Sequence, residues 1–331
     1  MQKQAIWIDI LRYALPVSTK RKPEAGSSDT IASDTAGAKT VPLIPRRFEG
    51  MMGAGVSTAG NQYFTISVRF PSAASAHSAM EFIVDTACSY TLIADKAARL
   101  LGATSTGVGA TGTTATGSTS GGQFQVKAGE ALCGDVSLGS LMPVSMPQLP
   151  FDYDVHGVAG ILGLETLSKF DIEFDFRQQR MRLFPPGSLS SNPGLTKGFE
   201  AMEMKLIPMF GLYYIDVKLG STLIKGIVDT GASGSVFNSI AASQAGITGT
   251  GKGVVSGAGA GQIPMKEADM QIGVLQRVVA VEKAGIADLP IFLNLFPASR
   301  EAVGVLGIDF LSNVNAQGRC FFSLATRKLW L

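Results

Sequence analysis

Short apolar or alternating runs, separated by Gly, Ser, Thr and Pro, follow one another along most of the chain. Runs of this kind, rich in β-branched and aromatic residues, predict strands joined by turns. Residues 92–101 and 236–245 instead have the composition of short helices, and glycine follows each of them at Gly102 and Gly246. Glycine at this position commonly ends a helix in left-handed backbone. The pattern predicts an all-β fold with short helices.

The pattern repeats with an offset of 144 residues. Ile-Val-Asp-Thr around Asp85 returns around Asp229, and Ile-Leu-Gly ending at Gly163 returns as Val-Leu-Gly ending at Gly307. A period of this size is a domain length, well above the roughly 20–50 residues of a solenoid repeat. A Pro/Gly/Ser stretch at 185–194 has no periodicity and is typical of a domain boundary. We therefore expect one domain over residues 58–187, a linker over 188–196 and a second domain over 197–331.

The N-terminal segment, residues 1–57, predicts an unpacked leader or linker. Its part from residue 18 to 47 mixes Lys, Arg, Ser, Thr, Ala and Pro with little periodicity, which is typical of segments that do not pack. Asp9 and Arg12 interrupt the apolar start, so it does not resemble a secretory signal. An organelle transit peptide and an inhibitory leader removed by self-processing are the alternatives.

Composition gives no support to a nucleic-acid-binding, membrane-spanning or disulfide-rich protein. With 331 residues, 46% hydrophobic and 16% charged, the chain is long enough for two domains with cores. A net charge of +2 gives no reason to expect a nucleic-acid partner, and no apolar run reaches the length of a spanning helix. The scattered Cys88, Cys133 and Cys320 suggest neither a disulfide framework nor a metal site and favour an intracellular or organellar compartment over secretion. Cys88 is expected to be a small buried residue, with a reactive thiol as the alternative.

Asp85 and Asp229 carry the candidate chemistry, because each half of the repeat supplies one carboxyl group. Two carboxyl groups held close together share one proton, since like charges at short distance do not both ionise. The ionised group then serves as a base and the protonated group as an acid. A single Asp-Thr-Gly is also ordinary turn chemistry, so the duplication is what favours a catalytic pair.

These motifs resemble those of the pepsin/retropepsin superfamily of aspartic proteases, over about residues 58–331. The most specific part is Ile-Val-Asp-Thr-Gly-Ala-Ser at 227–233 followed by Val-Leu-Gly-Ile-Asp-Phe-Leu at 305–311. The resemblance implies two tandem, pseudo-twofold-related β-barrel lobes with short helices and an active-site cleft between them. It also implies an aspartic endopeptidase that needs no cofactor or metal, binds a peptide or protein substrate and works as a monomer, with Asp85 and Asp229 as its catalytic pair.

Four further residues support this pair in the resemblance. Thr86 and Thr230 would interlock beneath the two carboxyl groups, and Gly231 would let the backbone approach them closely. The first copy departs from the pattern, because Ala87 stands where the family has glycine. A methyl group here is small, but small errors in catalytic geometry are costly. A catalytically silent peptide-binding or scaffold protein that keeps the duplicated barrel is therefore the alternative function.

Gly/Ser/Thr-rich segments at 104–122 and 248–261 occupy the places where the family carries mobile hairpins over the cleft. The flap tyrosine of pepsin-like enzymes has no counterpart in them, which favours the retropepsin comparison. Both contain glycine patterns close to nucleotide-binding loops, but without the strand, helix and Ser/Thr context that such loops need. Glu165 and Asp309 follow the later glycines and are predicted to be strand-end or cap residues.

Overall fold

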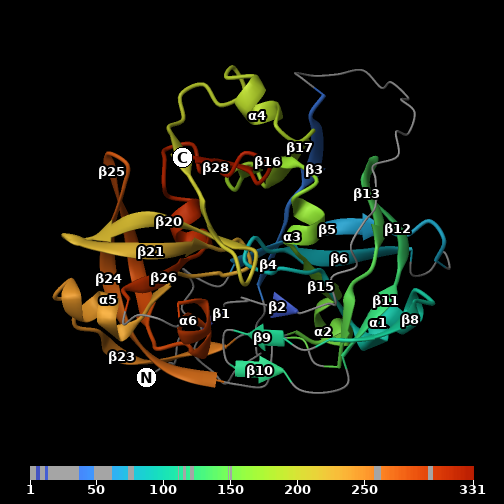
Figure 1. Cartoon of the computed structure of the whole chain (residues 1–331), viewed down its shortest axis with the longest axis horizontal. Coiled ribbons are helices and arrows are strands. Elements are labelled where there is room, and N and C mark those ends of the chain that lie inside the picture. Colours follow the sequence, from blue (N-terminus) through green and yellow to red (C-terminus); the bar gives the residue numbers. More distant parts are fainter. Residues whose placement is uncertain are drawn as a thin grey trace.

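The computed structural model confirms the predicted all-β fold, since strands dominate and the helices are short (Figure 1). It describes the backbone of residues 5–7, 12–13, 112–113 and 117–119, and residues 37–47, 62–73, 78–110, 114, 123–147, 149, 151–256, 262–296 and 301–331 in full. Its described helices are α1 (Asp95–Leu100), α2 (Tyr153–His156), α3 (Leu164–Leu167), α4 (Ser188–Ser191), α5 (Ser239–Gln244), α6 (Pro290–Leu295) and α7 (Ile308–Leu311).

Each half of the chain builds one sheet among the described residues, the first on the right of Figure 1 and the second on the left, and strand β1 from the N-terminal segment joins the second sheet. The first runs, in spatial order, β13 (Val136–Leu141), β12 (Gly129–Cys133), β5 (Gln62–Arg69), β6 (Ala79–Val84), β15 (Val158–Leu162), β7 (Leu92–Ala94), β14 (Val144–Met146), β11 (Phe124–Lys127) and β8 (Thr104–Gly109), and β4 (Ile44–Arg47) also pairs with β5. The second runs β1 (Ala5–Trp7), β23 (Thr250–Ser256), β24 (Gln262–Val274), β25 (Arg277–Ile286), β22 (Val236–Phe237), β26 (Val303–Leu306), β21 (Thr222–Val228), β20 (Leu212–Leu219) and β19 (Lys205–Ile207).

The two sheets have the same strand order. The series β8-β11-β14-β7-β15-β6-β5-β4 corresponds strand for strand to β23-β24-β25-β22-β26-β21-β20-β19. The parallel pairs correspond as well, because β15 pairs with β6 as β26 pairs with β21. Sequence positions 144 residues apart therefore occupy equivalent places at the centre of each sheet.

A third sheet joins the halves, at the top of Figure 1. Its order is β18 (Ala201–Glu203), β28 (Lys328–Trp330), β27 (Arg319–Ser323), β16 (Asp171–Asp175), β17 (Arg180–Phe184) and β3 (Lys39–Pro42). Buried Glu173 on β16 forms ion pairs with Arg182 of the first half and Arg319 of the second. The edge-to-face contact of Phe174 with Phe322, 5.5 Å between ring centroids, adds apolar packing across the same junction.

The predicted helix ends are confirmed at Gly102 and Gly246, which have φ of +68° and +69°. They follow α1 and α5, the described helices in the two predicted helical stretches. Only glycine adopts this backbone without steric penalty from a Cβ atom. The linker also has structure, because residues 188–191 form α4 and Leu189 is buried beside Phe184 and Phe321.

The predicted unpacked leader is wrong at each of its described segments: residues 5–7 and 12–13 pair as β1 and β2 (Arg12–Tyr13) with strands of the two hairpins. Residues 39–47 form β3 and β4, and Val41 and Leu43 are buried. Val41 and Leu43 are two positions apart and Pro42 between them is exposed, which matches a half-buried strand, although Pro42 and Pro45 hide that signal in the sequence. Most of the remaining leader lies outside the described residues.

Candidate active site

Asp85 and Asp229 stand at the ends of the central strands β6 and β21. The residues before them, such as Ile83 and Ile227, are fully buried in the sheet. The Asp85 N–H donates to the carbonyl of Leu162, and the Asp229 N–H donates to the equivalent carbonyl of Leu306, both at 3.1 Å. The chain then leaves each sheet through a tight loop, which we call the first loop (residues 85–91) and the second loop (residues 229–235).

The two loops are joined by a threonine interlock of four hydrogen bonds. The N–H of Thr86 donates to Thr230 Oγ1, and the N–H of Thr230 donates to Thr86 Oγ1, both at 3.1 Å. Each hydroxyl in turn donates across the junction, Thr86 to the carbonyl of Val228 at 2.9 Å and Thr230 to that of Val84 at 2.8 Å. Both threonines are buried. The interlock therefore brings together two aspartates that are 144 residues apart in the sequence.

Each carboxyl group is oriented by the backbone of its own loop. The N–H of Ala87 donates to Asp85 Oδ1 at 2.6 Å, and the N–H of Gly231 donates to Asp229 Oδ1 at 2.8 Å. Both aspartates are 0% exposed in the folded chain. Such N–H donors hold an ionised carboxylate strongly and in one direction.

Gly231 lies directly against the partner carboxyl group. A Cβ atom added to Gly231 would lie 2.4 Å from Asp85 Cγ and 2.5 Å from Asp85 Oδ2. Gly231 thus contacts the Asp85 carboxyl group while its N–H holds the Asp229 carboxyl group. The two acidic side chains therefore meet at this one residue.

The later glycines, Gly163 and Gly307, lie against the backbone of the two loops. A Cβ atom on Gly163 would approach the backbone carbon of Tyr90 to 2.5 Å, and one on Gly307 would approach that of Gly234 to 2.7 Å. The residues that follow bind the loops, since Leu164 N–H donates to the carbonyl of Cys88 at 2.7 Å. Close backbone crossing explains why both positions are glycine.

The serines and the cysteine of the loops are not equivalent. Ser89 Oγ donates to the carbonyl of Phe210 at 2.6 Å, which ties the first loop to the second half. Ser233 is buried. Cys88 is fully buried and its thiol donates to the carbonyl of Tyr90. Away from the site, burial raises the pKa of the Cys133 thiol to about 12, so it is a poor nucleophile near neutral pH.

The two glycine-rich segments form hairpin strands. In the first half, β8 pairs with β11, and the chain between them forms a smaller sheet of β10 (Gly117–Thr119), β9 (Gly112–Thr114) and β2 (Arg12–Tyr13). Strand β9 contacts α6 of the second half, near the lower centre of Figure 1. In the second half, β23 and β24 form the hairpin, and its tip at 257–261 lies outside the described residues.

Glu165 and Asp309 are not simple cap residues. The N-caps of α3 and α7 are Gly163 and Gly307. The Asp309 carboxyl group instead binds Ser235 at the end of the second loop, and the Glu165 carboxyl group binds the Thr166 hydroxyl, which contacts Thr91 at the end of the first loop. Sequence reasoning missed this role. The signal was present, because the two acidic residues are also 144 positions apart.

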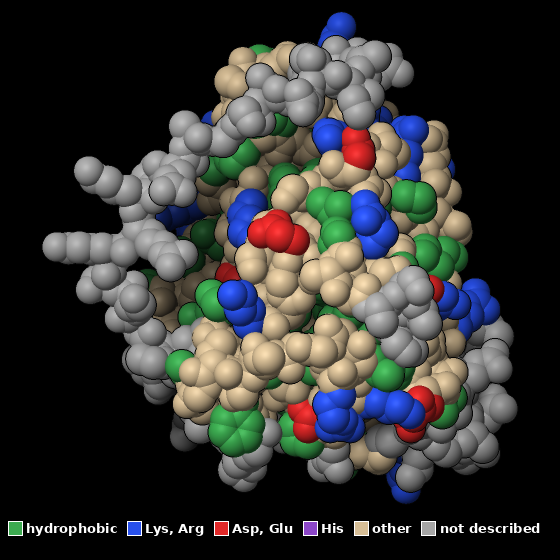
Figure 2. All heavy atoms as spheres, turned by 90° about the vertical axis from the view of Figure 1, so that its right-hand side faces the viewer, with side chains coloured by type: hydrophobic (Ala, Val, Ile, Leu, Met, Phe, Trp, Pro, Cys, Tyr) green, Lys and Arg blue, Asp and Glu red, His purple; other side chains and the backbone are tan. Residues whose placement is uncertain are grey.

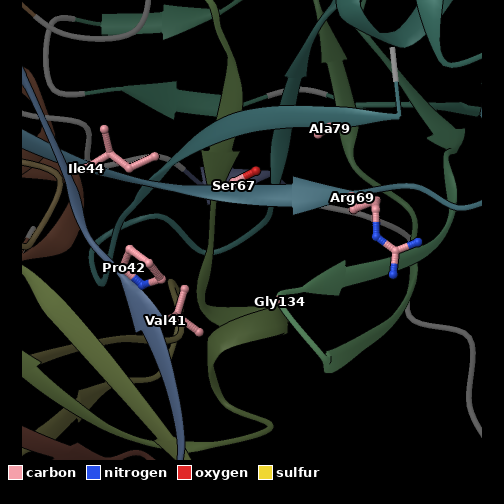
Figure 3. A pocket seen from close by; sticks show the side chains of 7 residues that line it. All are labelled: Val41, Pro42, Ile44, Ser67, Arg69, Ala79 and Gly134. Atoms are coloured by element: carbon pink, nitrogen blue, oxygen red, sulfur yellow. The ribbon is translucent and has the colours of Figure 1, made fainter. Parts of the chain in front are cut away.

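Elsewhere in the described residues, pockets and surfaces carry fewer candidate catalytic side chains than the two loops. The pocket in Figure 3 is lined by residues of β3, β4, β5, β6 and the turn at Gly134, with Arg69 as its one ionisable side chain. On the face in Figure 2, charged side chains of both signs are scattered among polar and backbone atoms. Within the described residues, no group of three or more His, Cys, Asp and Glu is arranged to bind a metal ion. Nor is any helix in that part of the chain both long and apolar enough to span a membrane.

Comparison with known proteins adds no assignment: no protein-family model matches the chain, and no curated protein matches it. The candidate function therefore depends on the residues and geometry of the two loops.

Proposed function

We propose that this protein is an aspartic endopeptidase of retropepsin type, in which each half of the chain is one lobe and Asp85 and Asp229 activate a water molecule. The observation that carries the proposal is the threonine interlock, with an aspartate beside each threonine and one N–H donor on each carboxyl group. Ordinary turns do not require two such loops to bind each other reciprocally. A paired carboxyl site does require it, because its two groups come from different parts of the chain.

The chemistry follows from two carboxyl groups that share one proton. The ionised group takes a proton from water as the water oxygen attacks the peptide carbonyl carbon, and the protonated group gives its proton to the carbonyl oxygen. In the second step the C–N bond breaks, the amine nitrogen receives a proton from one carboxyl group, and the other carboxyl group takes the proton of the collapsing diol. We expect the carboxyl oxygens of Asp85 and Asp229 about 3 Å apart, as sharing a proton requires.

The substrate in this proposal is an extended peptide. The hairpin β8–β11 of the first half and the hairpin β23–β24 of the second half have the glycine content that permits close backbone approach and strand-like pairing. The chemistry requires no cofactor, and both carboxyl groups belong to one chain, which suits a monomer.

Ala87 supports the alternative, a silent peptide-binding protein. Its methyl group is fully buried beside the candidate pair, at the position equivalent to Gly231. If the Ala87 methyl group holds the carboxyl groups of Asp85 and Asp229 apart, the protein would bind peptide without hydrolysing it.

Cleavage of an unstructured protein at several acidic and neutral pH values, with and without a statine-containing peptide, separates these functions. We expect cleavage that the statine peptide blocks, and its loss in Asp229→Asn, because an amide neither accepts the proton of water nor exchanges roles with Asp85. Asp288→Asn is the matched control, since Asp288 is an exposed aspartate of the same half. Equal cleavage by Asp229→Asn and the unmodified protein would refute the mechanism. Statine binding without any cleavage would favour the silent binder.

A further inference from the structure

Asp309 holds the far end of the second loop. Its Oδ2 accepts the backbone N–H of Ser235 at 2.8 Å, and its Oδ1 accepts the Ser235 hydroxyl at 2.7 Å. The Ser235 hydroxyl also accepts the N–H of Gly307 at 3.0 Å. One carboxyl group thus fixes both the backbone and the side chain of the residue that ends the loop.

Glu165 has the equivalent place behind the first loop. Its Oε1 accepts the hydroxyl of Thr166 at 3.0 Å, and that hydroxyl lies 3.2 Å from the hydroxyl of Thr91. Thr91, like Ser235, accepts the N–H of the later glycine, here Gly163 at 3.2 Å. Thr91 ends the first loop and lies 144 positions before Ser235, so the two networks are counterparts.

Glu165 and Asp309 are half-buried as whole residues, and the burial of their carboxyl groups shifts the pKa of each. Burial raises the pKa of Asp309, against the opposing effect of the hydrogen bonds from Ser235 and Phe310. Burial likewise raises the pKa of Glu165, against the hydrogen bonds from Thr91 and Thr166. A buried carboxyl group is unfavourable unless hydrogen bonds compensate, and here the compensating donors come largely from the loops that carry Asp85 and Asp229.

We propose that Glu165 and Asp309 form a second pair of carboxyl groups, which positions the catalytic pair by anchoring the ends of the two loops. Neither acts on substrate. Each works through Thr91 or Ser235, so both are positioning residues. This inference rests on the proposed function, because it assigns the anchors a role in hydrolysis.

The direct contact of Asp309 with Ser235 makes the second loop the sharper test. Asp309→Ala removes both of its hydrogen bonds to Ser235 and leaves the loop end held only by the bonds from the N–H groups of Gly307 and Gly285. A misplacement of about 1 Å lowers catalysis by about 100-fold, so we expect kcat to fall by about 10- to 100-fold with KM within about twofold. Asp309→Asn keeps the shape, one acceptor and one donor toward the Ser235 hydroxyl, and should recover most of the lost kcat.

Asp288→Ala is the matched control. Asp288 accepts the backbone N–H and the hydroxyl of Ser239, both at 2.8 Å, which is the same recognition at the start of α5. It is exposed and does not hold either loop. We expect Asp288→Ala to keep the kcat of the unmodified protein.

Steady-state kinetics and urea unfolding of each variant decide between positioning and mere stability. A normal kcat in folded Asp309→Ala would overturn the positioning role, whatever its stability. If Asp309→Ala does not fold, Ser235→Ala keeps the N–H contact with Asp309 and removes the hydroxyl contacts with Asp309 and Gly307. An unchanged kcat in that variant would overturn the role equally. Absence of cleavage by the unmodified protein is a different outcome, since it rejects the proposed function itself and the positioning role with it.

Discussion

The first and second loops have the same hydrogen-bond pattern, but they differ in how tightly the surrounding atoms pack against them. In each loop the aspartate carboxyl group accepts the backbone N–H of the residue two positions later, and the threonine between them takes part in the interlock. At Gly231, however, an added Cβ atom would lie 2.4 Å from Asp85 Cγ, whereas the fold already contains the methyl group of Ala87, which is fully buried.

This difference shows that a duplicated site need not stay symmetric in its packing. Glycine is required where the backbone of the second loop touches the partner carboxyl group. At the equivalent place in the first loop the surrounding atoms accommodate one more carbon. Substitutions in and behind the two loops test whether the loops are equivalent in hydrogen bonding and different in packing, and they follow in order of decreasing expected effect.

Gly231→Ala should have the largest effect. The new methyl group would displace the Asp85 carboxyl group, and we expect kcat/KM for peptide cleavage to fall by about 100-fold or more. Overpacking should also lower the free energy of unfolding by about 1–3 kcal/mol. The swapped variant Ala87→Gly/Gly231→Ala should be as impaired as Gly231→Ala alone. Recovery of activity in the swapped variant would show that the loops are interchangeable after all.

Thr86→Val and Thr230→Val should affect stability equally, because each removes one hydroxyl that accepts an N–H and donates to a carbonyl of the other half. Leaving a buried N–H unsatisfied costs about 1–3 kcal/mol, measured by urea unfolding. The double variant should lose less than the sum of the two, since they share one network. Thr106→Val on exposed β8 is the control, with an expected change within about 0.5 kcal/mol. A large difference between Thr86→Val and Thr230→Val would contradict the reciprocity.

The carboxyl groups of Glu165 and Asp309 predict a pH dependence. Burial raises the folded-state pKa of Asp309 above 3.8 and that of Glu165 above 4.5. At pH values between the unfolded-state pKa and the raised folded-state pKa of each group, the folded protein retains a proton that the unfolded chain has lost. The free energy of unfolding therefore falls as the pH rises through this range. Asp309→Asn and Glu165→Gln, which do not titrate, lack this fall. Their stability relative to the unmodified protein should therefore increase as the pH rises above about 4. A constant difference in urea unfolding would contradict the shifts.

Ala87→Gly should have the smallest effect. It removes a methyl group that the first loop accommodates, so activity should equal or exceed that of the unmodified protein. Added backbone freedom should lower the free energy of unfolding by about 0.5–1 kcal/mol. Peptide cleavage and thermal unfolding measure the two effects. If the unmodified protein does not cleave peptide and Ala87→Gly does, the protein is instead a protease that Ala87 has inactivated.

Much of the fold could be predicted from the sequence, because local signals and the repeat agree. The 144-residue offset places Asp85 and Asp229 on equivalent strands, and Gly102 and Gly246 end their helices in left-handed backbone as expected. The threonine contact follows from the family resemblance and not from the pattern of hydrophobic residues.

The rest depends on long-range packing that no local pattern contains. The strand at 39–42 is specified by pairing with β17, far along the chain, while Pro42 disguises it in the sequence. A carboxyl group at residue 309 has the sequence signature of an ordinary helix start, and only the crossing of the chain beneath the second loop reveals its contact with Ser235.

The sheet that joins the halves has a consequence for chain continuity. Three of its strands precede the linker and three follow it, so a single cut within residues 185–194 would leave two fragments held together without a covalent bond. In the intact chain, the short connection gives each half a local concentration of the other in about the millimolar range. After the cut, the meeting of Thr86 with Thr230 becomes a bimolecular equilibrium that dilution can reverse. The fusion of the two halves thus keeps the site assembled at concentrations where a pair of separate subunits would come apart.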